Sequence, residues 1–125
     1  QDMEPKHQLG DLLPLTIADR ISVQSENMRL SIESVGESRC PLNVQCIQAG
    51  KAKVKLSVQK EDMVFFVDLT AKGNCQKTDG SCGDSATVRG YKYTLMTLGP
   101  YPGEDGNTAV QQDKYIATVR VEKAD

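Results

Sequence analysis

Residues 51–59 read Lys51-Ala52-Lys53-Val54-Lys55-Leu56-Ser57-Val58-Gln59, with an apolar side chain at every even-numbered position. Successive side chains of a β-strand point to opposite faces of a sheet, so this alternation predicts a strand with one buried and one solvated face. Residues 28–33 and 114–122 follow the same two-residue period. The chain is therefore predicted to be built mainly from antiparallel β-sheet.

The remaining strand candidates are shorter or more uniformly apolar. Residues 63–69 (Met-Val-Phe-Phe-Val-Asp-Leu) are apolar on both faces, which predicts a central strand. Three further segments complete a set of about seven strands: 21–24, 86–89 and 91–98. Turn-forming residues separate them at 25–27, at 60–62 and at Gly90. The pattern predicts an all-β, single-domain β-sandwich, or a partly open barrel, of antiparallel strands.

Length and charge limit the class of protein. A chain of 125 residues fits one domain, and we expect a flexible polar leader or tether over residues 1–12 and the β-sandwich domain over residues 13–125. The net charge of −2 comes from 15 basic and 17 acidic residues, which argues against nucleic acid as a partner. No apolar run approaches the ~18 residues that a spanning helix needs, so no transmembrane segment is expected.

The four cysteines are Cys40, Cys46, Cys75 and Cys82. Four cysteines allow three connectivities, and the spacing does not match the Cys-x-x-Cys pattern of zinc sites or redox dithiols. Local pairing of Cys40 with Cys46 and of Cys75 with Cys82 is favoured, because Pro41 bends the first loop and Asp79-Gly80 is a turn signal in the second. Two such disulfides predict an oxidising compartment.

The segment 37–50 (Glu-Ser-Arg-Cys-Pro-Leu-Asn-Val-Gln-Cys-Ile-Gln-Ala-Gly) resembles a signature of small bacterial envelope proteins, often lipoproteins. That group has Asp where this chain has Glu37 and an aromatic where it has Gln48. The resemblance implies an exported protein in the periplasm, outer membrane or cell surface, with a candidate lipid anchor upstream of Gln1. It implies no activity. Independently of it, Arg39 and Glu37 are placed to pair across the base of the loop.

Catalytic chemistry has little support in the sequence. The only histidine is His7, in the polar leader, so a Ser-His-Asp arrangement is not expected and we assign no catalytic residue, cofactor or metal ligand. Two oxygen-rich groups are candidate calcium sites, but neither matches the calcium-loop pattern of a full EF-hand. They are Asp79, Ser81 and Asp84 in one group, and Glu104, Asp105 and Asn107 in the other.

Two surfaces remain as candidates for contact with a partner. The first is a contact loop formed by Arg39, Pro41, Leu42 and Tyr101, the last from a long connection over residues 99–113. The second is a row of positive charge for an anionic partner or membrane surface, formed by Lys51, Lys53 and Lys55; the alternative is an edge strand protected from aggregation by its lysines.

The function expected from these features is a non-catalytic binding or structural module that contacts an envelope protein or polymer. The alternative is a peptidase inhibitor that presents the Cys40–Cys46 loop, with Leu42 as the inserted side chain. The exposure of Leu42 distinguishes these possibilities. An inhibitor needs Leu42 to protrude, whereas a purely structural loop would bury Leu42 or Val44 against the sheet.

Overall fold

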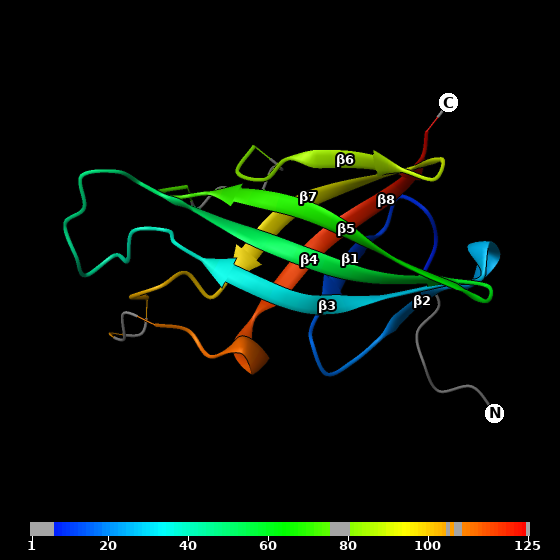
Figure 1. The fold of residues 1–125 in the computed structure, drawn as a ribbon, viewed down its shortest axis with the longest axis horizontal. Coiled ribbons are helices and arrows are strands. Elements are labelled where there is room, and N and C mark those ends of the chain that lie inside the picture. The colour runs from blue at the N-terminus through cyan, green and yellow to red at the C-terminus, as the bar shows by residue number, and fades with distance from the viewer. Residues whose placement is uncertain (1–6, 76–80, 105, 107–108, 125) are drawn as a thin grey trace.

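A computed structural model describes residues 7–75, 81–104, 106 and 109–124, and these form two four-stranded antiparallel sheets packed face to face (Figure 1). One sheet has the order β2-β3-β4-β5 and the other β1-β8-β7-β6. The first comprises β2 (Ile21–Val23), β3 (Met28–Glu37), β4 (Lys51–Lys60) and β5 (Met63–Lys72), and the second β1 (Leu12–Leu15), β6 (Ser85–Val88), β7 (Tyr91–Gly99) and β8 (Ile116–Lys123). Two single-turn 3-10 helices, η1 (Gln24–Glu26) and η2 (Gln112–Lys114), lie in connections. The predicted β-sandwich is confirmed.

The core is formed by the faces that the two-residue period predicts. On β4, Ala52, Val54, Leu56 and Val58 are all completely buried. The facing sheet contributes the side chains of Tyr93, Leu95, Tyr115, Ala117 and Val119, which are also completely buried. With few aromatic residues and no tryptophan in the chain, aliphatic side chains supply most of the buried apolar surface.

The strand that sequence reasoning missed is β1. It pairs with β8 and buries Leu13 and Leu15 completely, but its four residues include Pro14. Proline has no backbone N–H and cannot donate a hydrogen bond to a neighbouring strand. It is therefore found mainly at sheet edges. β1 occupies such an edge, which gives eight strands in the described part of the chain where about seven were predicted.

Two predictions about strand position were wrong. Residues 63–69 were predicted to form a central strand, but β5 lies at the edge of its sheet and leaves Val64 and Phe66 exposed. Conversely, β4 lies between β3 and β5, so its lysines do not protect an edge. The apolar content of a strand indicates how far its side chains are buried. Its position at the edge or centre of a sheet depends instead on backbone pairing with strands that are distant in sequence.

The connections between the strands are short turns, apart from a few longer loops such as the one between β3 and β4. Turns fall where predicted, at Gln24–Asn27, at Glu61-Asp62 and at Arg89-Gly90, and both residues of the last turn have positive φ as a type I′ hairpin requires. The β3–β4 connection, which carries Cys40 and Cys46, extends beyond the sheets at the end opposite the two termini (Figure 1). Over the described residues, no helix has the length and apolar character needed to cross a bilayer.

Candidate functional site

Both local disulfides are present, as predicted. Cys40 bonds to Cys46 with a Cα–Cα distance of 5.9 Å, and Cys75 bonds to Cys82 with a Cα–Cα distance of 5.6 Å. The Asp79-Gly80 turn signal lies outside the described residues. Because disulfides persist where glutathione and thioredoxin do not reduce them, the pair indicates an oxidising, extracytoplasmic protein.

Backbone contacts close the Cys40–Cys46 loop at its base. Ser38 donates from its backbone N–H and from Oγ to the carbonyl of Lys51, at 2.9 and 2.6 Å, and the Cys40 N–H donates to the carbonyl of Ala49 at 2.7 Å. The return strand begins after Gly50, whose φ is +74°, and a Cβ there would lie 1.9 Å from the Ser38 carbonyl oxygen. Only glycine allows the two arms to approach this closely.

An ion pair between buried Arg39 and half-buried Glu37 lies beneath the loop. Arg39 is 4% exposed and donates from Nε and Nη2 to the two carboxylate oxygens of Glu37, at 2.8 and 2.7 Å. Its Nη1 donates to the carbonyl of Leu98 at 3.0 Å, and the Tyr115 hydroxyl donates to Glu37 Oε1 at 2.8 Å. The predicted pairing of Arg39 and Glu37 is confirmed, and it connects the loop to β7 and to the residue before β8 of the opposite sheet.

The electrostatics of this group follow from its burial. Burial raises the pKa of Glu37, but the hydrogen bonds from Arg39 and Tyr115 outweigh it and leave that pKa below its ordinary value of 4.5. Burial and the hydrogen bond to Glu37 raise the pKa of the Tyr115 phenol. Glu37 is therefore ionised and Tyr115 neutral at any physiological pH, which is the state that these hydrogen bonds require.

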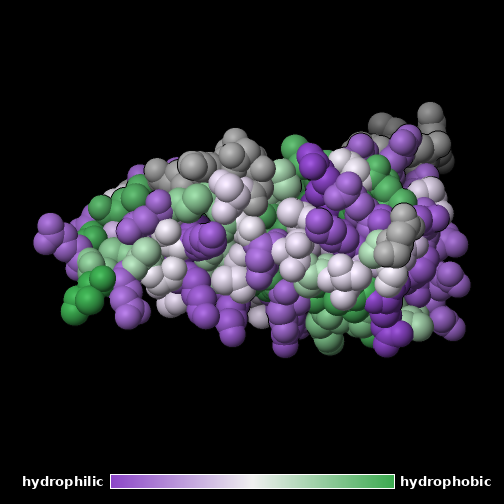
Figure 2. Space-filling view, turned by 90° about the horizontal axis from the view of Figure 1, so that it is seen from above, coloured by the Kyte–Doolittle hydropathy of each residue, from purple (hydrophilic) through white to green (hydrophobic). Residues whose placement is uncertain are grey.

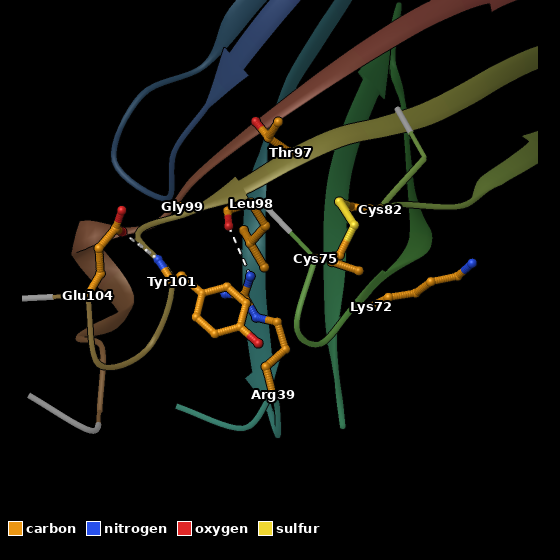
Figure 3. A pocket seen from close by; sticks show the side chains of 10 residues that line it. Arg39, Lys72, Cys75, Cys82, Thr97, Leu98, Gly99, Tyr101 and Glu104 are labelled. Atoms are coloured by element: carbon orange, nitrogen blue, oxygen red, sulfur yellow. Dashed lines mark hydrogen bonds between the residues drawn. A yellow bond between two sulfur atoms is a disulfide. The ribbon is translucent and has the colours of Figure 1, made fainter. Parts of the chain in front are cut away.

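Tyr101 completes the support of the loop. Its ring centroid lies 4.6 Å from Cζ of Arg39, its hydroxyl accepts from the Asn74 N–H at 2.5 Å, and its own N–H donates to Glu104 Oε2 at 2.9 Å. Arg39, Tyr101 and Glu104 line a pocket of about 200 Å³ together with the Cys75–Cys82 disulfide (Figure 3). Arg39 and Tyr101 were both predicted to belong to an exposed contact loop. Both side chains are instead buried beneath the Cys40–Cys46 loop and support it.

The other members of the predicted contact loop lie at the surface. Pro41 is half-buried, and Leu42 is 50% exposed. Two more apolar side chains accompany Leu42, with Val44 44% exposed and Ile47 fully exposed. Figure 2 shows hydrophobic side chains projecting at the same end of the molecule. We call Leu42, Val44 and Ile47 the apolar tip.

The backbone beneath the apolar tip is also anchored from outside the disulfide. The Leu42 N–H donates to the carbonyl of Pro102 at 2.9 Å, and Asn43 Nδ2 donates to the carbonyl of Gly106 at 3.1 Å. Gly103 allows this approach, because a Cβ there would lie 2.7 Å from the Leu42 nitrogen. The 99–113 connection, from which Tyr101 was predicted to join the contact loop, thus supports the first loop in its described part.

Ile47 was not predicted as a site residue. A signal for it existed, since Ile47 is an apolar residue between Cys46 and Gln48, outside any stretch with the two-residue period of a strand. Tyr115 was predicted only as a core residue, and nothing in its sequence context reveals that its hydroxyl reaches Glu37.

The predicted row of lysines is solvent-exposed along β4, and only one end of it lies near the loop. Lys51 immediately follows the loop, and its register partner on β5 is Lys72. Lys55 lies further along the strand, with Nζ 5.5 Å from the Phe66 ring centroid. Lys53, between them, pairs with Thr70 and Gly36 in the ladder. The row therefore extends away from the apolar tip instead of surrounding it.

Acidic groups weighed as metal ligands have other roles where the structure describes them. Asp84 Oδ1 accepts from the Thr70 N–H at 2.7 Å, and Glu104 accepts from Tyr101. Asp79, Asp105 and Asn107 lie outside the described residues. In the described ranges no three His, Cys, Asp or Glu side chains are grouped so as to hold a metal ion.

A scan against protein-family models and searches of curated proteins and of solved structures return no match to this chain. The resemblance of residues 37–50 to small bacterial envelope proteins therefore stays a prediction. The fold and site define a β-sandwich with a disulfide-closed loop on a partly buried ion pair.

Proposed function

We propose that this chain is an exported, non-catalytic binding module of the bacterial envelope that contacts a protein partner through the apolar tip. The observation that carries the proposal is the exposure of Leu42, Val44 and Ile47 on a loop that is otherwise firmly held. A loop with a purely structural role would bury such side chains, because apolar side chains stabilise a fold only when they are removed from water.

The anchoring of the loop favours recognition. A disulfide, a partly buried ion pair and hydrogen bonds to Pro102 and Gly106 restrict the backbone before any partner arrives. Association then orders fewer groups, so more of the contact energy remains as affinity. Burying the apolar tip would contribute roughly 3–5 kcal/mol at the usual free energy per unit of apolar area.

The disulfides and the resemblance of residues 37–50 support the proposed location in the periplasm, outer membrane or cell surface. The same resemblance supports attachment through a lipid anchor upstream of Gln1. A protein partner is preferred over a polymer, because the tip is apolar and carries no charged side chain, whereas sugars and anionic polymers are recognised mainly by polar and charged groups.

The experiment compares capture of envelope proteins by immobilised variants. In the test variant Leu42→Ser and Ile47→Ser are combined; the control is Ile116→Ser, which removes a 47% exposed apolar side chain from β8. The proposal expects a partner captured by the unaltered chain and by the control, with recovery by the test variant reduced at least about tenfold. Equal recovery by all three baits would reject the apolar tip as the contact.

The alternative function, inhibition of a peptidase, is favoured by one observation. Leu42 is half exposed on a preorganised loop, which is the geometry that insertion into a peptidase specificity pocket requires. The test is inhibition of a panel of serine and metallo-peptidases by the unaltered chain and by Leu42→Ala. Competitive inhibition that Leu42→Ala abolishes would establish the inhibitor, and absence of inhibition across the panel would leave the binding module.

A further inference from the structure

Strand β5 is the longest edge strand of the two described sheets, and it is open along its first part. The other three edge strands of the two described sheets are short: β2 has three residues, while β1 and β6 have four each, and β1 contains Pro14. β5 has ten residues. Natural proteins protect such edges because unpaired backbone groups invite another strand.

The hydrogen bonds at one end of β5 reveal which backbone groups face this edge. The Thr70 N–H donates to Asp84 Oδ1, the Thr70 carbonyl accepts from the Asp84 N–H at 3.0 Å, and the Lys72 N–H donates to Cys82 at 2.8 Å. These contacts lie on the side of β5 away from β4. Since backbone direction alternates along a strand, the even-numbered residues of β5 face the edge.

Residues Val64, Phe66 and Asp68 therefore direct their N–H and carbonyl groups outward. No described strand pairs with them on that side: β4 lies on the other side, and β6, which begins next to Thr70 of β5, pairs with β7 in the opposite sheet. The open stretch is bounded by the Glu61-Asp62 turn and by the contact of Thr70 with Asp84. Its middle residue is Phe66.

Three usual protections of an edge strand, namely proline, lysine and a bulge, are missing from this stretch, and Asp68 is its one charged residue. Residues 63–71 contain no proline and no lysine, and the pairing of β5 with β4 runs without a bulge, unlike the β3–β4 and β7–β8 pairings. Val64 is 57% exposed and Phe66 50% exposed. The sequence has the composition of a strand paired on both sides, which is why it predicted a central one.

We propose that a second copy of this chain pairs with β5 in antiparallel fashion, about a two-fold axis at Phe66. This register sets Phe66 opposite Phe66 of the second copy, and Val64 opposite Asp68 of the second copy. It uses all three outward-facing residues on each side and stops where Thr70 is already paired. A two-fold contact needs a self-complementary patch, and in this register each of the three outward-facing residues pairs with a member of the same set.

The side chains agree with this arrangement. In the two-fold register Asp68 faces Val64 of the second copy, so no like charges lie opposite each other in the open stretch. Within one copy, Lys55 of β4 is the register partner of Asp68 and lies over the Phe66 ring. The two sheets would join into one continuous sheet of eight strands. The Cys40–Cys46 loop lies beyond the Lys51–Lys72 end of the sheet, away from the pairing, and stays free to bind its own partner.

Sedimentation of the purified chain from roughly micromolar to millimolar concentration tests the proposal, because dimerisation follows mass action. A dimer is expected, with its dissociation constant raised at least about tenfold by Phe66→Lys and unchanged by Ile116→Lys, which alters an equally exposed apolar residue on β8. Dimerisation that Phe66→Lys leaves intact would overturn the assigned edge.

Amide hydrogen exchange of the unaltered chain gives a second test that does not depend on a variant folding. At low concentration the N–H groups of Val64, Phe66 and Asp68 should exchange quickly, while those of Phe65 and Val67, which bond to β4, exchange slowly. At high concentration the three outward amides should become protected together. A chain that stays monomeric, with these amides exchanging quickly at every concentration, would overturn the proposal and leave the edge to an extended segment of another protein.

Discussion

Arg39 and Glu37 form a two-point ion pair at the end of β3, in which both carboxylate oxygens of Glu37 accept from the Arg39 guanidinium at 2.7 and 2.8 Å. Arg39 is buried and Glu37 half-buried under a disulfide-closed loop whose outer side chains are exposed. The same residues thus fix the loop and leave its surface available, which is the arrangement on which the proposed binding function rests.

Substituting Glu37→Gln should lower the free energy of unfolding by about 3 kcal/mol, because it leaves the buried Arg39 charge without its counter-ion. Urea unfolding at neutral pH measures this change. The matched control is Glu33→Gln, the same change at an exposed position of β3, for which less than about 0.5 kcal/mol is expected. Equal effects of the two substitutions would mean that the ion pair adds no stability.

The sequence predicts the strands and the local disulfides because both depend on short-range information. Alternation marks β4, and close cysteine spacing with turn residues marks the two loops. The edge position of β5, the proline-containing β1 and the burial of Tyr101 depend on pairing and packing between distant segments. For the same reason the exposure of Ile47 and the contact of Tyr115 with Glu37 became visible only in three dimensions.

The contribution of Glu37 should depend on pH. Its pKa in the folded protein is lowered below 4.5, so the folded state favours the ionised form more than the unfolded chain does. The stability advantage over Glu37→Gln is then complete above pH 4.5 and declines as the pH falls through the folded-state pKa. Unfolding of both proteins from pH 7 downward measures this difference; a difference that grows on acidification would show that the sign is wrong.

Two buried tyrosines should respond in opposite ways to loss of the hydroxyl. Tyr115 donates to the carboxylate of Glu37, so Tyr115→Phe should cost about 1.5–3 kcal/mol. The Tyr93 hydroxyl is fully buried without a hydrogen-bond partner among the described residues, so Tyr93→Phe should be neutral or stabilising. Thermal unfolding of both variants provides the comparison, and a larger loss from Tyr93→Phe would contradict the assigned network.

Replacing Cys40 and Cys46 together by serine should lower stability by about 2–2.5 kcal/mol, as expected for a short loop, without abolishing the fold. The core strands do not depend on this bridge, because the loop projects from the end of the sheets. Circular dichroism and denaturant unfolding check both points. Complete unfolding of the variant at room temperature would show that the core is weaker than its burial indicates.

Site-specific photo-crosslinking in envelope preparations tests most directly whether the apolar tip is the contact surface. A photoreactive residue is placed in turn at Leu42, at Ile47 and, as a control of similar exposure to Leu42, at Ile116 on β8. We predict one common crosslinked protein from positions 42 and 47 and none of it from position 116. Crosslinks to that protein from position 116 alone, or equally from all three positions, would contradict the claim.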